Sequence, residues 1–322
     1  MSGASVNYRI EPSAPLGAEI RRLSTGLLDA AVNDLRQSGT VDATTLASVA
    51  ARLAEVRSLL RLGRSVVDPT ARSSVVRAVK AAQRSLRRPP DHVAAFELAA
   101  ASAAASVTTA ALHRLRLALG QPILRPGQLE RPAAPIDVGE VVDRLDAAVL
   151  AASLWASPVV DGFALLAPGL AREYQRGREA LDGLSADRIG GPTHDQAAGF
   201  AGRSLDHHHH LRLLRPVWPK MVKLLVHESR TLVGLAERQL QLGLLADELE
   251  RCEGPQLRRD AGALLGVLAE DRSDLLGETR WLGARIYADE PGALIRRFDA
   301  WWSATERGTA GPHVGSERAA TR

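Results

Sequence analysis

Residues 16–36 have the sequence Leu16-Gly-Ala-Glu-Ile-Arg-Arg-Leu-Ser-Thr-Gly-Leu-Leu-Asp-Ala-Ala-Val-Asn-Asp-Leu-Arg36. Apolar residues recur in it every three or four positions, which is the spacing that places side chains on one face of an α-helix. The segment therefore predicts one amphipathic helix. Its inward face would carry Ile20, Leu23, Leu27, Leu28, Ala31 and Leu35.

The same periodicity continues on the carboxyl side of this segment. Leu46, Val49, Leu53, Val56 and Leu60 form a second apolar stripe. Alanine and leucine dominate the chain and no long period-two segment occurs, so we expect an all-α protein of long antiparallel helices. Short polar residues that can cap helix starts stand at Asp42, at Ser185-Ala-Asp187 and at Thr193-His-Asp195.

Proline and glycine divide the chain into parts. The segment Pro126 to Pro135 also holds Gly127 and Pro132, and is the best candidate for a linker. It separates two comparable helical halves, at about 6–125 and 137–305, joined by a linker at about 126–136. Residues 306–322 are rich in glycine, alanine, serine and arginine without an apolar period, so we expect a disordered tail.

Length and composition exclude several classes of protein. A chain of 322 residues with 45% hydrophobic residues can bury a sizeable core, which excludes intrinsically disordered and collagen-like classes. The single cysteine, Cys252, cannot form an internal disulfide. The start has no signal-peptide pattern, and no apolar run is long enough to span a membrane. A cytoplasmic protein is expected.

Basic charge is concentrated in one part of the chain. The net charge is only +4, and lysine occurs only at Lys80, Lys220 and Lys223, so almost all cations are arginines. Residues 57–88 contain nine cations and one acid, Asp68, which gives this window +8 and leaves −4 for the rest. The spacing of these cations places two sets on helix faces: Arg57, Arg61 and Arg64; and Arg77, Lys80, Arg84 and Arg87.

Two such faces on neighbouring helices predict a trough of positive potential, although each could also be an ordinary solvated face. A weaker basic run follows in the second half, with Arg203, Arg212 and Arg215 among its members. A polyanion would bind such surfaces with a steep salt dependence, because it releases condensed counterions on binding. No helix-turn-helix, zinc finger or aromatic stacking sheet is recognisable, so sequence-specific nucleic-acid binding is not expected.

The run His207-His-His-His210 is the only apparent candidate for metal binding. Only Asp206 stands near it at ligand spacing, whereas a closed zinc site needs four ligands. We therefore expect a polar, partly exposed turn and no metal site. An alternative is that these histidines act as titratable cations and strengthen anion binding below about pH 6.5.

Catalytic motifs and cofactor-binding fingerprints are absent from the sequence, so an enzyme is not expected. Cys252 lies beside Glu250 and Glu253, which would raise the pKa of its thiol and make it a poor nucleophile.

Four segments in chain order resemble a known family. The main one runs from Gly162 to Leu181, and its spacing is carried by Gly169, Leu170, Tyr174, Gly177 and Arg178. The others are Tyr8-Arg-Ile-Glu-Pro12, Leu211-Arg-Leu-Leu-Arg-Pro-Val-Trp-Pro219 and Leu282-Gly-Ala-Arg-Ile-Tyr-Ala-Asp-Glu-Pro291. Together they resemble the CHAD family, the conserved histidine α-helical domain, over about residues 6–305.

The resemblance implies two helical bundles related by an internal repeat, and binding of inorganic polyphosphate in a basic groove without catalysis. Tyr174 and Arg178 would either contact a phosphate chain or hold a helix pair together. The expected site combines the basic faces with this segment: Arg57, Arg61, Arg64, Arg77, Lys80, Arg84, Arg172, Tyr174, Arg176, Arg178, Arg203, Arg212 and Arg215.

The chain departs from the family at its namesake residues. Alignment on the basic segments puts Ala47 and Ala198 where the family has histidines. Cations of the family are replaced at Ala50, Ala54, Ala201, Gly202 and Leu205. The alternative is therefore a degenerate helical scaffold that has lost polyanion binding and contacts a protein or a storage-granule surface.

Overall fold

The computed structural model describes residues 6–37, 42–86, 92–120, 136–156, 161–184 and 191–309, and these residues form an all-α fold without strands. The fold class predicted from the sequence is confirmed. The elements in chain order are α1 (Leu16–Gln37), α2 (Ala43–Leu62), α3 (Pro69–Ser85), α4 (His92–Ala103), α5 (Thr109–Gly120), α6 (Val138–Ser153), η1 (Phe163–Leu165), α7 (Ala167–Asp182), α8 (His194–Leu213), η2 (Arg215–Val217), α9 (Pro219–Glu250), α10 (Pro255–Ile286) and α11 (Pro291–Thr309). No helix among the described residues is long and apolar enough to cross a membrane.

Two of the predicted helix caps are present. The carboxylate of Asp42 accepts a hydrogen bond from the backbone N–H of Thr45 at 2.7 Å. Thr193 and Gln196 form a reciprocal capping box at the start of α8. Each cap satisfies backbone donors that have no partner within the helix. The cap predicted at Ser185-Ala-Asp187 lies outside the described residues.

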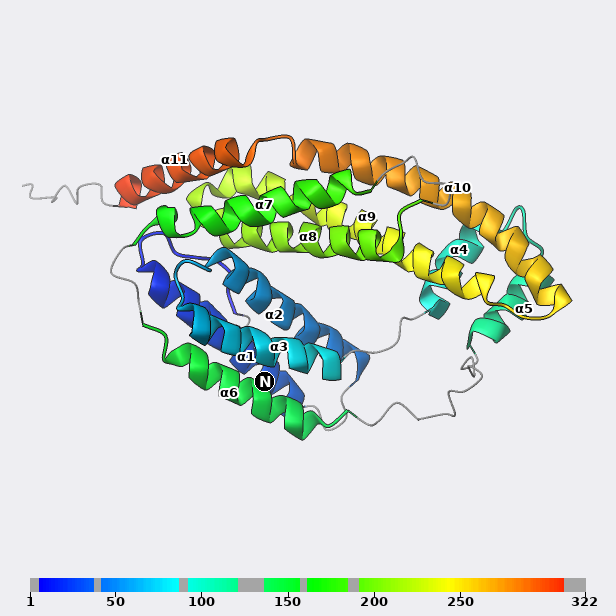
Figure 1. Cartoon of the computed structure of the whole chain (residues 1–322), viewed down its shortest axis with the longest axis horizontal. Helices are drawn as coiled ribbons and strands as arrows, with labels where there is room; N and C mark the ends of the chain where they lie inside the picture. Colours follow the sequence, from blue (N-terminus) through cyan, green and yellow to red (C-terminus); the bar gives the residue numbers. More distant parts are fainter. Residues whose placement is uncertain are drawn as a thin grey trace, which may run out of the picture.

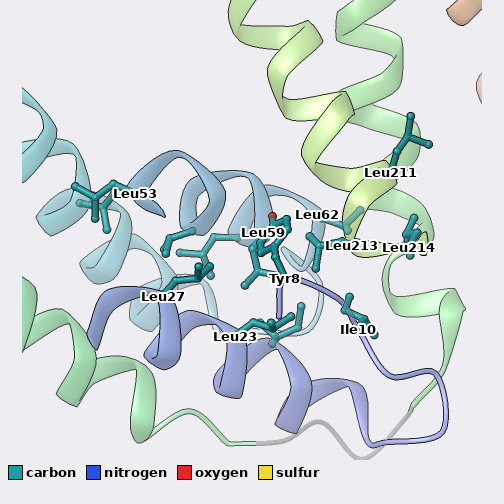
Figure 2. Close-up of a cluster of buried hydrophobic side chains, with 14 of the residues drawn as sticks. Tyr8, Ile10, Leu23, Leu27, Leu53, Leu59, Leu62, Leu211, Leu213 and Leu214 are labelled. Atoms are coloured by element: carbon teal, nitrogen blue, oxygen red, sulfur yellow. The ribbon is translucent and has the colours of Figure 1, made fainter. Parts of the chain in front are cut away.

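Helix α1 has the extent and the buried face that its sequence predicts. It runs from Leu16 to Gln37, and all six residues of the expected inward face are buried. Figure 2 shows leucines of α1, α2 and the end of α8 gathered around Tyr8. The Tyr8 hydroxyl donates to the backbone carbonyl of Glu55 at 3.1 Å, and Ile10 N–H donates to Leu213 O at 3.1 Å. The segment before α1 therefore ties α2 to the end of α8.

The helices do not group in space as they follow one another along the chain. Helix α6 belongs to the expected second half, yet it packs against α1 and α3 (Figure 1). Helices α4 and α5 belong to the expected first half, yet they pack against the far ends of α9 and α10 and form a separate small core there. The predicted linker at about 126–136 lies outside the described part of the chain except for its last residue, Ile136.

The antiparallel helices α8, α9 and α10 pack side by side and connect the two cores. The predicted tail boundary at 306 is wrong, because α11 continues to Thr309. The rest of the predicted tail lies outside the described residues.

Candidate functional site

A pocket with a strongly cationic lining lies between α2, α3 and α7. Among the described residues, eight cations and one acid line it, in a cavity of about 380 Å³. We call it the cationic pocket. Its charged lining residues are Arg57, Arg61, Arg64, Arg72, Arg77, Lys80, Arg172, Glu173 and Arg176.

Close contact between two helices brings these cations together. The start of α7 crosses the end of α2 at Gly169, where a Cβ atom would stand 2.0 Å from the carbonyl oxygen of Leu62. Only glycine fits against a backbone at that distance. The approach places Arg172 and Arg176, one and two turns further along α7, beside the basic face of α2.

Two buried acids hold the inner side of the cationic pocket. Glu173, only 4% exposed, accepts from Arg176 at 3.0 Å and from Arg203 at 2.9 Å. Asp206 on α8, only 5% exposed, pairs with Arg61 and lies 3.7 Å from Arg203. Charge pairing offsets the cost of burying these carboxylates. Arg61, Arg176 and Arg203 therefore have fixed positions.

The remaining cations of the pocket have no ion pair among the described residues: Arg57, Arg64, Arg72, Arg77, Lys80 and Arg172. Arg57 donates to the side-chain oxygen of Gln83 at 2.8 Å. Burial lowers the pKa of Arg57, and repulsion from Arg61 lowers it further. The ends of Arg77 and Lys80 lie on the exposed face of α3. An anion in the pocket would relieve the repulsion among these groups.

A smaller cavity of about 250 Å³ adjoins the cationic pocket and shares Arg57 and Arg61 with it. It lies between α2 and α8, and Arg203 and Asp206 also line it. The rest of its lining consists of small or apolar residues. These are Ala54, Ala198, Gly199, Gly202 and Leu205. Four of the five, all but Gly199, are positions at which the resemblance puts a histidine or a cation.

The structure thus brings together eight of the thirteen predicted site residues. Seven line the cationic pocket, and Arg203 lines the adjoining cavity. The five residues that line neither are Arg84, Tyr174, Arg178, Arg212 and Arg215.

Tyr174 and Arg178 hold helices together. Tyr174 is 1% exposed, its hydroxyl donates to Ile286 O at 3.1 Å, and burial raises its pKa to about 12. Arg178 pairs with Glu290 at 2.9 Å. These contacts, at the end of α10 and the start of α11, agree with the alternative that the two residues hold a helix pair together.

The other three lie away from the pocket. Arg212 pairs with Glu55 at 2.6 Å and stacks over the ring of Tyr8. Arg84 is exposed one turn beyond Lys80 on α3, and Arg215 lies in η2. Helical spacing predicts which residues share a face, but a face can extend beyond the pocket that it borders.

The four histidines contradict both expectations drawn from the sequence. They belong to α8 rather than to a turn, and His207, His209 and His210 are at most 5% exposed. The Nδ1 of His209 contacts Ser58 Oγ at 3.1 Å, and Nε2 of His210 contacts Ser58 O at 3.0 Å. Ser58 Oγ in turn donates to Asp206 at 2.6 Å, so His209 and His210 each donate a hydrogen bond to Ser58.

Burial lowers the pKa of His207 and His209 to about 3 and that of His208 to about 4. The pKa of His210 is also lowered by burial. His207, His208 and His209 are therefore uncharged just below pH 6.5, where the hypothesis of titratable cations requires them to be charged. They form the buried wall behind Asp206.

Two charged residues of the cationic pocket, Arg72 and Glu173, are absent from the predicted site. Arg72 lies in the same nearly acid-free window, which is the signal that could have identified it. Glu173 has no such signal, because only the fold shows that it is buried against Arg176 and Arg203.

No group of three or more histidine, cysteine or acidic residues in the described part of the chain could hold a metal ion. The pKa of the Cys252 thiol is raised, by burial and then by Glu248. The predicted direction is confirmed, although the neighbouring acid is a different one. No protein-family model and no curated protein sequence matches the chain.

Proposed function

We propose that this protein binds inorganic polyphosphate, or a similar polyanion, in the cationic pocket without catalysis. The observation that carries the proposal is the convergence of eight cations and one acid on one cavity, from α2, the turn that follows it, α3 and α7. An ordinary solvated surface mixes charges of both signs, because like charges on neighbouring turns repel. Such a concentration of unpaired cations is favourable when an anion occupies it.

The chemistry of the pocket fits successive phosphates. Guanidinium groups donate two parallel hydrogen bonds to phosphate oxygens, and seven of the eight cations are arginines. Arg61 and Arg176 are held by buried acids and would give fixed contacts. Arg77 and Lys80 at the rim would add charge that salt can screen.

The adjoining cavity supports a divergent relationship to the CHAD family. Ala54, Ala198, Gly202 and Leu205 come from two distant segments, and they meet around the same cavity. If the family's cations once stood there, their replacement would leave small residues around a space beside Arg57 and Arg61. We propose a polyanion groove that is truncated on this side and retained on the α3 side.

The test is a calorimetric titration with inorganic polyphosphate of one chain length, at several salt concentrations between about 50 and 200 mM. The test variant is Arg77→Ser with Lys80→Ser, since both residues are exposed and their loss leaves the core intact. The matched control, Lys220→Ser with Arg258→Ser, removes the same charge from exposed positions that line neither cavity.

We expect the wild type and the control to bind with similar affinity and a steep dependence on salt. The test variant should bind at least about tenfold more weakly at low salt, with a slope of log K against log salt smaller by about 0.7 per lost contact. If the test variant and the control lose the same affinity for polyphosphate, the anion binds to positive charge anywhere on the surface and not to the cationic pocket. No binding by the wild type at low salt would favour the alternative, a helical scaffold that contacts a protein or a storage-granule surface.

A further inference from the structure

A second hollow region lies between α9, α10 and the start of α8, outside the cationic pocket. It consists of cavities of about 720 and 270 Å³ that share five lining residues. We call the two together the α9–α10 cavity. The shared residues form the boundary between its two parts: Gly191, Gln239, Ala246, Glu250 and Arg272. Sites for small molecules typically have volumes of about 300 to 1,000 Å³.

Gln239 is an unsatisfied polar group in this boundary. Its side chain is 3% exposed, and neither the amide nitrogen nor the amide oxygen has a hydrogen-bond partner among the described residues. Buried polar groups in proteins are almost always paired, and an unpaired one disfavours the folded state. A bound molecule that pairs with both ends of this amide would remove that cost.

Arg272 lies across the same boundary. Its Nη2 is 3.7 Å from the place where a Cβ of Gly243 would stand and 3.8 Å from the corresponding place at Gly191. Its Nε is buried and has no hydrogen-bond partner within the described ranges. Gln239 and Gly243 are one turn apart on α9, so the amide and the guanidinium approach the same face of that helix.

The charge of this cavity differs from that of the cationic pocket. Arg272 and Arg280 are matched by Asp247 and Glu250, so the lining has no net charge. Leucines of α10, including Leu265, Leu268 and Leu276, form an apolar wall. This lining does not attract a polyanion. It favours an uncharged molecule with a flat apolar face and polar edges.

We propose that the α9–α10 cavity binds a nucleoside. A nucleobase carries a donor and an acceptor side by side on one edge, which is the complement of a carboxamide with both ends free. Its faces pack against the leucines of α10. The ribose hydroxyls donate to Asp247 or Glu250 and accept from Arg272, which accounts for acids in a site that also holds an arginine. This proposal does not depend on polyphosphate binding.

The experiment titrates uridine, cytidine, adenosine and guanosine into the full chain and follows binding by calorimetry. The tightest of the four is compared with its analogue methylated on the nitrogen of the pairing edge, such as 3-methyluridine for uridine. The variant Gln239→Leu keeps an apolar side chain of similar length in the cavity. Arg77→Ser with Lys80→Ser, in the cationic pocket, is the matched control.

We expect at least one nucleoside to bind the wild type with a dissociation constant of about 1 mM or tighter. Methylation of its edge, and Gln239→Leu, should each weaken binding about tenfold or more, while the control variant binds as the wild type does. A protein that binds none of the four nucleosides overturns the proposal, and the cavity then holds water only. If folded Gln239→Leu binds the nucleoside as tightly as the wild type does, the nucleobase edge does not pair with Gln239, and that part of the proposal is overturned.

Discussion

The cationic pocket and the α9–α10 cavity are both formed where helices from distant parts of the chain meet, but they differ in charge. The first has eight cations against one acid, and the second has two cations against two acids. Glu173 in the first, and Asp206 beside it, are buried and paired with arginines. In the second, the buried Gln239 has no hydrogen-bond partner in the part of the chain that the structure describes.

The difference shows two ways in which a fold prepares a surface for binding. The cationic pocket concentrates one sign of charge at an open face, so we expect the affinity for an anion there to depend on salt and little on the shape of the anion. The α9–α10 cavity has one hydrogen-bonding group unpaired among the described residues, so we expect the affinity for a ligand there to depend on the shape and the polar edge of the ligand. Three further predictions test this contrast, from the largest expected effect to the smallest.

Acid should destabilise the core behind the cationic pocket. His207 and His209 have pKa values lowered to about 3 by burial, whereas an exposed histidine has a pKa of about 6.5. The unfolded chain therefore takes up protons below about pH 6.5 while the folded chain does not. Their contribution to stability is complete above that pH and is lost as the pH falls, by about 2 kcal/mol for each residue at about pH 5.

Urea unfolding at about pH 7 and about pH 5 measures this loss. The variant His209→Gln keeps a donor for Ser58 and cannot be protonated. Its loss of stability between the two pH values should be smaller than that of the wild type by about 2 kcal/mol. The same loss in both proteins would show that His209 does not contribute to it.

Substitution of a glycine by alanine should destabilise the protein at the cationic pocket but not at the α9–α10 cavity. Gly169→Ala puts a Cβ 2.0 Å from Leu62 O, so α7 must move away from α2, at a cost of about 3 kcal/mol. The shift also moves Arg172 and Arg176 away from Arg57 and Arg61, which should weaken polyphosphate binding.

Gly243→Ala, in the α9–α10 cavity, is the matched substitution. Its Cβ would meet Arg272 Nη2 at an ordinary 3.7 Å, and alanine favours a helix over glycine by about 1 kcal/mol. We expect its free energy of unfolding to be equal to that of the wild type or higher. If both substitutions lower the free energy of unfolding by the same amount, α7 does not depend on a close contact with α2 at Gly169.

The smallest effect should come from the unpaired amide. Gln239→Leu removes two buried polar atoms that have no partner, so the free protein should become more stable by about 1 kcal/mol. Thermal or urea unfolding without ligand measures the change, with Arg77→Ser and Lys80→Ser as a pair that leaves the core unaltered. A clear loss of stability would show that Gln239 is paired in the folded protein.

Local residue patterns predicted the helices and part of the candidate site. Helix α1, the caps at Asp42 and Thr193, and the basic faces of α2 and α3 depend on spacings within a few turns, which an amino-acid sequence displays directly. Five of the eight cations of the pocket were found in this way, and Arg172 and Arg176 came from the segment that resembles the CHAD family. The pairing of α6 with α1 and α3 was not found, because it joins segments that are far apart in the sequence.

The histidines show why the remaining site residues could not be assigned. A run of four histidines looks the same in the sequence whether its helix is exposed or buried. The packing of α2, α7 and α9 against α8 buries them, and burial lowers their pKa values. Tyr174 is likewise a binding candidate by its type and a buried helix contact by its position.

The sequence by itself determined the helical class, the positions of most helices and the charge on each helix face, because these follow from residues that are neighbours along the chain. The tertiary structure alone decided which faces meet. It placed α7 against α2 at Gly169, buried Asp206 and the histidines behind the arginines, and left Gln239 unpaired between α9 and α10. Close contact, burial and the lack of a hydrogen-bond partner are relations between distant segments, and they exist only once the chain has folded.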